Sequence, residues 1–171
     1  MMQLENLVGV PWPAVDSWKE PGLVDQLPDQ GSLPPDAAHQ LARILGRHTA
    51  TASSCWFAIW EGFGDLGALR DLVAARLPVP QRGMVVLRGR LEDADQLVTD
   101  CGRFQSANLW WPDDRSWCVA TEIDLRSTYV GGSPSAIQAV IDDPSLEAFA
   151  ADASDRIDVW SDTRNPAPAD G

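Results

Sequence analysis

The pattern of hydrophobic positions predicts five helices along the chain. Apolar residues recur three and four apart over residues 35–48 and 66–77, and more weakly over 91–101, which is the spacing of one helix face. Ser133 is followed by Pro134, a capping hydroxyl before a proline at the first helical position. Asp143 and Pro144 repeat this device, so we expect a helix from Pro134 and a shorter one that ends near Phe149.

Short apolar or alternating runs predict the strands. They cover residues 55–61, 83–90, 107–111, 116–125 and 128–131, and the sequence RIDVW at 156–160 suggests a last short strand. Pro112-Asp113-Asp114-Arg115 separates two of these strands. Proline fixes φ and aspartate accepts local backbone hydrogen bonds, so this segment predicts the turn of a hairpin.

Strands that follow one another, with helices between and after them, indicate an α+β fold in a single domain. We expect a mostly antiparallel sheet covered by amphipathic helices. The helix between 55–61 and 83–90 leaves a parallel crossover, and hence a mixed sheet, as the alternative. Proline-rich residues 1–34 are expected to form an irregular, Trp-containing arm packed on the domain, residues 35–160 the core domain, and residues 161–171 a flexible tail.

Composition narrows the possible partners and the compartment. A chain of 171 residues with 44% hydrophobic residues and eight Trp suits one globular core. The net charge of −12 disfavours nucleic acids and anionic membranes. No signal peptide or long apolar span is apparent, and three widely spaced cysteines are typical of reduced, mostly buried thiols. We therefore expect a cytoplasmic protein.

Metal and nucleophile patterns are missing from the sequence. His39 and His48 face opposite sides of their predicted helix, and no CxxC, HxH or HExxH pattern occurs. Cys118 would need one of these histidines as a base, so an inert thiol is the better interpretation. The glycines of GFGDLG at 62–67 are interpreted as turn glycines, because an acid inside the loop would repel a phosphate. No cofactor is expected.

Three carboxylates form one candidate catalytic site. Alternation along 116–125 places Glu122 and Asp124 on one strand face, within about 7 Å of each other. Glu61 ends a buried strand and could join them in an acidic site of a small-molecule-binding domain or hydrolase. The alternative is a solvated face whose acids pair with arginine. The arginines that could pair with these acids are Arg88, Arg115 and Arg126. The opposite face of this strand is expected to face the core with Trp117, Val119, Thr121 and Ile123.

The hairpin forms a candidate binding surface. Its residues are Trp110, Trp111, Asp113, Asp114 and Arg115. Tryptophan and arginine are common hot-spot residues of protein interfaces. Because adjacent residues of a strand face opposite sides, at least one of the two tryptophans belongs to the core.

Three segments resemble an uncharacterised family of small proteins from high-GC actinobacteria. They are CWFAIWEGFG, RGMVVLRGRL and QSANLWWPDDRSWCVATEIDLRSTYVGGS, within residues 55–150. The resemblance implies a cytosolic bacterial domain and no activity. The net charge of −12, the absence of a nucleophile or metal pattern and the aromatic and acidic residues of the hairpin favour a non-enzymatic, acidic protein-binding domain with a basic partner. Toxin-neutralising immunity proteins are one such kind. The sequence leaves the oligomeric state open.

Overall fold

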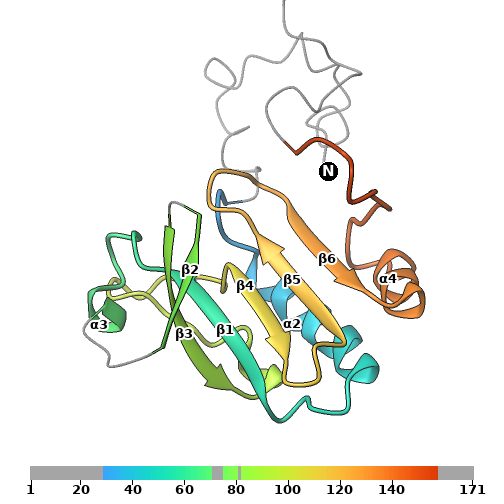
Figure 1. The fold of residues 1–171 in the computed structure, drawn as a ribbon, viewed down its shortest axis with the longest axis horizontal. Coiled ribbons are helices and arrows are strands. Elements are labelled where there is room, and N and C mark those ends of the chain that lie inside the picture. The colour runs from blue at the N-terminus through green and yellow to red at the C-terminus, as the bar shows by residue number, and fades with distance from the viewer. Residues whose placement is uncertain (1–28, 71–74, 81, 158–171) are drawn as a thin grey trace, which may run out of the picture. The chain divides into compact units, whose positions relative to one another are not determined.

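The computed structural model describes residues 29–70, 75–80 and 82–157 (Figure 1). The chain divides into two compact units, residues 28–146 and residues 1–27 with 147–171. Of the second unit, only residues 147–157 are described, and they contain neither helix nor strand. The predicted arm therefore lies mostly outside the described residues. Within the described ranges, no helix is long and apolar enough to cross a bilayer.

Six strands form one sheet in the first unit. They are β1 (Cys55–Trp60), β2 (Ala75–Val79), β3 (Arg82–Gly89), β4 (Leu109–Pro112), β5 (Trp117–Thr121) and β6 (Thr128–Gly132). The strand order is β2-β3-β1-β4-β5-β6, and every neighbouring pair is antiparallel. The predicted α+β fold is confirmed, and the mixed sheet with a parallel crossover is wrong.

Two longer helices lie beside this sheet. Helix α2 (Pro35–Leu45) continues into the 3-10 turn η3 (Gly46–His48) and lies behind β4 and β5 in Figure 1. The indole Nε1 of Trp117 donates a hydrogen bond to the carbonyl of Leu45 at 3.0 Å, which joins α2 to the sheet. Helix α4 (Pro134–Ile141) begins as predicted, because the Ser133 hydroxyl accepts a hydrogen bond from the backbone N–H of Ala136.

The sheet face toward α2, called the inner face below, forms the core. Phe57 stacks on Trp110 with ring centroids 6.2 Å apart, and Trp110 meets Trp117 edge-on at 5.6 Å. The alternation predicted for β5 is confirmed where the strand exists, because Trp117, Val119 and Thr121 are all buried. Large aromatic side chains thus fill the space between α2 and the three central strands.

The helix predicted over 66–77 is wrong. Helix α3 covers only Gly67–Arg70, and Ala75–Val79 forms the edge strand β2. Residues 71–74 lie outside the described residues. Proline lacks a backbone N–H and is tolerated only where a strand has no neighbour on one side, and Pro78 occupies such an edge strand. Leu77 fits both a helical stripe and a strand face, so local periodicity does not distinguish them.

The later helix predictions also fail. Leu91–Asp93 is a 3-10 turn, η4, and the chain then forms a turn closed by a bridge between Val98 and Phe104. The predicted short helix after Asp143 is a turn, because the Asp143 carboxylate accepts hydrogen bonds from the backbone and hydroxyl of Ser145. Arg156 and Ile157 are not in a strand, and residues 158–160 lie outside the described part of the chain.

Candidate functional site

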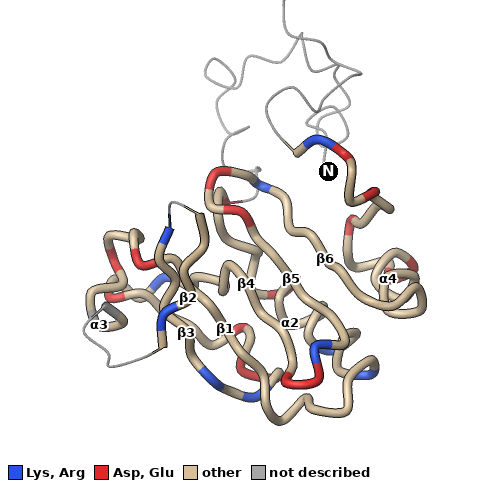
Figure 2. Tube along the Cα trace, in the orientation of Figure 1, with Lys and Arg blue, Asp and Glu red and all other residues tan. Residues whose placement is uncertain are grey.

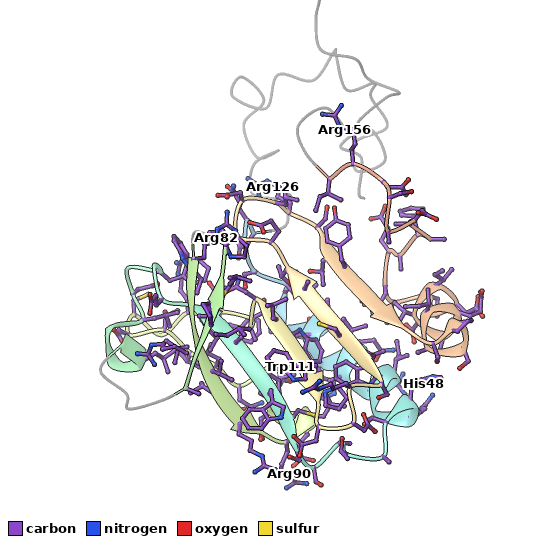
Figure 3. All side chains as sticks on the ribbon, viewed as in Figure 1. His48, Arg82, Arg90, Trp111, Arg126 and Arg156 are labelled. Carbon is purple, nitrogen blue, oxygen red and sulfur yellow. The ribbon has the colours of Figure 1, made fainter. Side chains whose placement is uncertain are left out.

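Glu122 and Asp124 lie beyond the end of their strand. Strand β5 ends at Thr121, so both acids belong to the turn before β6 and not to a strand face. They nevertheless converge on one side chain, because Arg82 donates hydrogen bonds to both carboxylates, at 2.6 Å to Asp124. Arg82 begins β3 and lies at this end of the sheet together with Arg126 (Figure 3).

The third acid of this set also has an arginine partner. The Glu61 carboxylate lies 3.5 Å from Nε of Arg76. Burial raises the pKa of Glu122, but hydrogen bonds from Arg82 and from the backbone of Asp124 outweigh this effect and hold the pKa below its ordinary value. A general acid at neutral pH needs a raised pKa. Each of these three carboxylates is instead paired with an arginine.

The first aspartate of the hairpin turn binds residues of neighbouring strands. Asp113 accepts hydrogen bonds from the indole of Trp56 at 2.5 Å, the hydroxyl of Ser54 at 2.6 Å and the guanidinium of Arg88 at 3.1 Å. Hydrogen bonds from Ser54 and Trp56 lower the pKa of Asp113. The Arg88 guanidinium also lies 5.3 Å from the centroid of the Trp56 ring, a cation–π distance. Asp113 therefore holds Trp56 and Arg88 in place.

The second aspartate fastens the loop that precedes β1. Asp114 accepts hydrogen bonds from the backbone N–H of Ala50 and the hydroxyl of Thr49, each at 2.8 Å, and from the N–H of Ser116 at 3.1 Å. Burial acts to raise the pKa of Asp114, but these hydrogen bonds lower it to about 2. The carboxylates of both aspartates thus bind groups of the same chain. Their role is to stabilise the hairpin turn and the loop beside it.

The two adjacent tryptophans of β4 separate as alternation requires. Trp110 is 2% exposed and belongs to the inner core, so its inclusion in the binding surface is wrong. Trp111 is half-buried on the opposite face of the sheet, where Figure 3 shows it in front of the strands. Arg115 takes the left-handed conformation, with φ of 53°, at the hairpin turn. Only Trp111 offers an aromatic surface from this pair.

The face on which Trp111 lies, called the outer face below, is mostly apolar, and its charged side chains are Arg82 and Arg88 at the two ends of β3. Directly opposed residues in an antiparallel sheet share a face. The register pairs Trp56 with Trp111, Trp60 with Met84, and Ala120 with both Leu109 and Tyr129. The apolar side chains of this face are Trp56, Ala58, Trp60, Ala75, Leu77, Val79, Met84, Val86, Leu109, Trp111, Cys118, Ala120 and Tyr129.

The outer face has no helix over it among the described residues of the unit 28–146. Helix α2 packs on the inner face, and the view of Figure 1 looks onto the uncovered side. Only Ala58 and Met84 of the outer face are buried, whereas its other side chains are half-buried or exposed. Figure 2 shows that β1, β4, β5 and β6 carry no charged residue. The sequence already indicated an apolar outer face, because every position of β1 is apolar.

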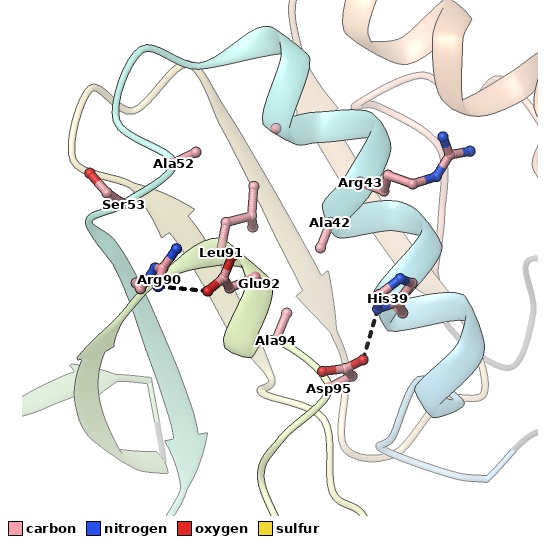
Figure 4. A pocket seen from close by; sticks show the side chains of 11 residues that line it. His39, Ala42, Arg43, Ala52, Ser53, Arg90, Leu91, Glu92, Ala94 and Asp95 are labelled. Carbon is pink, nitrogen blue, oxygen red and sulfur yellow. Dashed lines mark hydrogen bonds and ion pairs between the residues drawn. The ribbon is translucent and has the colours of Figure 1, made fainter.

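A shallow pocket lies on the helical side of the unit (Figure 4). It measures about 330 Å³ and lies between α2, η4 and the loop at Ala52 and Ser53. His39 binds Asp95 at 2.9 Å on one wall, and Arg90 binds Glu92 at 2.7 Å on another. On each wall the two polar side chains bind each other. Neither of these pairs is therefore directed into the pocket toward a ligand.

The cysteines only partly match the expectation. Cys55 is buried, and burial, with the nearby charges of Asp113 and Asp114, raises the pKa of its thiol to about 11. Cys101 and Cys118 are exposed, so the expectation of mostly buried thiols is wrong for them. Within the described ranges, no three His, Cys, Asp or Glu side chains are grouped to hold a metal ion.

Comparison with protein-family models, with curated proteins and with solved structures finds no match for this chain.

Proposed function

We propose that this protein is a non-enzymatic protein-binding domain that binds its partner through the outer face of the sheet. The observation that carries the proposal is the apolar surface formed by the half-buried side chains of Trp56, Trp60, Leu109 and Trp111, on strands without charged residues. Antiparallel sheets with one solvated face normally alternate apolar and polar residues. Strands that are apolar on both faces need cover on both.

The chemistry of this surface suits a protein partner. Monomeric proteins rarely expose a large contiguous apolar patch, and such patches mark interaction sites. Tryptophan is the residue type most enriched among interface hot spots. Trp56 is already oriented by its hydrogen bond to Asp113 and by Arg88 beside its ring. Binding therefore does not have to order this side chain, which reduces the entropic cost of association.

A basic partner, such as a toxin neutralised by an immunity protein, is a second candidate. The net charge of −12 supports it, since acidic proteins attract basic ones over long range. The charge is unevenly distributed: residues 28–146 contain 15 acidic and 10 basic residues, net −5, and the two terminal segments carry the remaining −7. The outer face itself contributes contact area and little charge.

The hydrolase alternative has less support. Each of its three carboxylates has an arginine partner, and a substrate would have to displace these ion pairs. The pKa of Glu122 also lies below its ordinary value, which is opposite to the shift that a general acid needs.

Capture from extracts of the source cells tests the proposed function. The baits are the wild type, Cys118→Asp, and two controls: Cys118→Ser at the same exposed position, and Val98→Asp, whose wild-type side chain is 56% exposed outside the six strands. We expect the wild type and both controls to retain the same protein and Cys118→Asp to lose it, because a charge would be buried at the interface. Equal retention by all four baits would exclude the outer face as the binding surface.

A further inference from the structure

We infer that the outer face binds a second copy of this chain, with the two sheets packed face to face. This inference rests on the proposed function, because it names the partner of the same surface. Face-to-face sheets pack about 10 Å apart through interdigitated apolar side chains. The inner face of this sheet already packs on α2, so the outer face is the one left for such a contact.

Symmetry is the first argument for a second copy. In a two-fold dimer the same patch occupies both sides of the interface, so the patch has to complement itself. A patch with net charge would repel its own copy. The four strands β1, β4, β5 and β6 present no charged residue, so a two-fold contact through these strands brings apolar side chains together. The two arginines of this face, Arg82 and Arg88, lie at the ends of β3 and are paired within one copy.

The charges at the border of the outer face are the second argument. Arg82 is paired with Glu122 and Asp124, and Arg88 with Asp113, all within one copy. These two arginines and three carboxylates leave a net charge of −1 at the border. A surface evolved for a basic partner would carry a larger excess of acids at its rim. Homodimer interfaces are also more apolar than transient ones, which agrees with this composition.

The total charge gives the inference a distinctive salt dependence. Two chains of net charge −12 repel each other at long range, and added salt screens this repulsion. Self-association through the apolar outer face should therefore strengthen as salt increases. Binding of a basic partner should weaken under the same change, because salt screens an attraction. The sign of the salt effect separates the two partners.

Sedimentation equilibrium of the full chain over a range of protein concentrations tests the inference. We expect a reversible dimer whose dissociation constant falls several-fold between low and high sodium chloride. Cys118→Asp should raise the dissociation constant at least about tenfold, whereas Cys118→Ser and Val98→Asp should keep it within about twofold, a difference of at most about 0.4 kcal/mol. Circular dichroism and urea unfolding establish that each variant is folded.

Three outcomes would contradict the inference that a second copy binds the outer face. A dimer unaffected by Cys118→Asp would place the interface elsewhere. A monomer at all concentrations with a freely reactive Cys118 thiol would leave the outer face to a different protein, and the capture experiment could still support the proposed function. A monomer whose Cys118 resists thiol reagents would show that other residues of the same chain cover the face, and the proposed function would fail with the inference.

Discussion

The indole Nε1 of Trp56 donates a hydrogen bond to Oδ1 of Asp113 at 2.5 Å, across 57 positions of the sequence. This bond joins an aromatic side chain of the outer face to the turn of the β4–β5 hairpin. Asp113 also accepts from Ser54 and Arg88, so one carboxylate orients the whole end of the face. The turn acids, which the sequence suggested as contacts for a partner, thus act as positioning residues.

Replacement of Asp113 by Asn tests this positioning role. The amide keeps an acceptor oxygen but loses the charge that strengthens the hydrogen bonds from Trp56 and Arg88. We expect a lower urea midpoint, a changed near-ultraviolet circular dichroism spectrum and weaker binding through the outer face. Asp29→Asn at an exposed position is the matched control and should change none of these. An unchanged spectrum for Asp113→Asn would show that Trp56 does not depend on this carboxylate.

Stability should decline at acid pH partly through Asp114. Its folded-state pKa is about 2, below its ordinary value of 3.8, so its contribution is present above about pH 4 and is lost as the pH falls toward 2. We expect Asp114→Asn to be less stable than the wild type at pH 7 and to lose less stability between pH 4 and pH 2. Urea unfolding at these pH values measures both. Parallel acid curves for the two proteins would contradict the assignment.

Gly31 is expected to be intolerant of a side chain. Its φ is +74°, and a Cβ atom would lie 2.9 Å from the carbonyl oxygen of Ile123. Gly31→Ala should therefore destabilise the fold by about 1–3 kcal/mol. Gly64→Ala is the control, because a Cβ there meets nothing within 4 Å and φ is not positive. Equal urea midpoints for the two variants would contradict the strain at Gly31.

The three thiols should differ in their reaction with a thiol reagent. Cys101 and Cys118 are exposed and should react in the native protein at low protein concentration. Cys55 is fully buried and its thiol pKa is about 11, so it should react only after unfolding. Counting reacted thiols before and after addition of denaturant measures this difference. Three fast thiols in the native state would mean that the core around Cys55 is open.

The local spacing of apolar residues predicted those elements that fit either the helical or the strand periodicity, but not both. Helix α2, strand β1 and the hairpin around Pro112 are of this kind, and the structure has all three. Residues 75–79 fit a helical stripe and a strand face equally well, so the choice depended on pairing with β3, which the sequence does not encode locally. Strand β5 is shorter than predicted, and this shift moved Glu122 into a turn.

The candidate site was harder to predict because its residues meet only through the strand order. Arg82 and Glu122 are 40 positions apart, and nothing in either local sequence pairs them. Glu122 and Asp124 do share a partner, Arg82, which offsets one of their two negative charges. The apolar strand β1 suggested cover on both sides. The structure places α2 on one side only, and that asymmetry identifies the outer face as the surface to test.

Site-specific photo-crosslinking in the source cells tests the role of the outer face most directly. A photoreactive phenylalanine analogue replaces Trp111 on the outer face in one protein and Val98 outside the sheet in another. We predict a single crosslinked protein species from position 111 and none from position 98, with mass spectrometry showing whether it is a second copy of this chain. Crosslinking from position 98 alone, or from neither position, would contradict a protein-binding outer face.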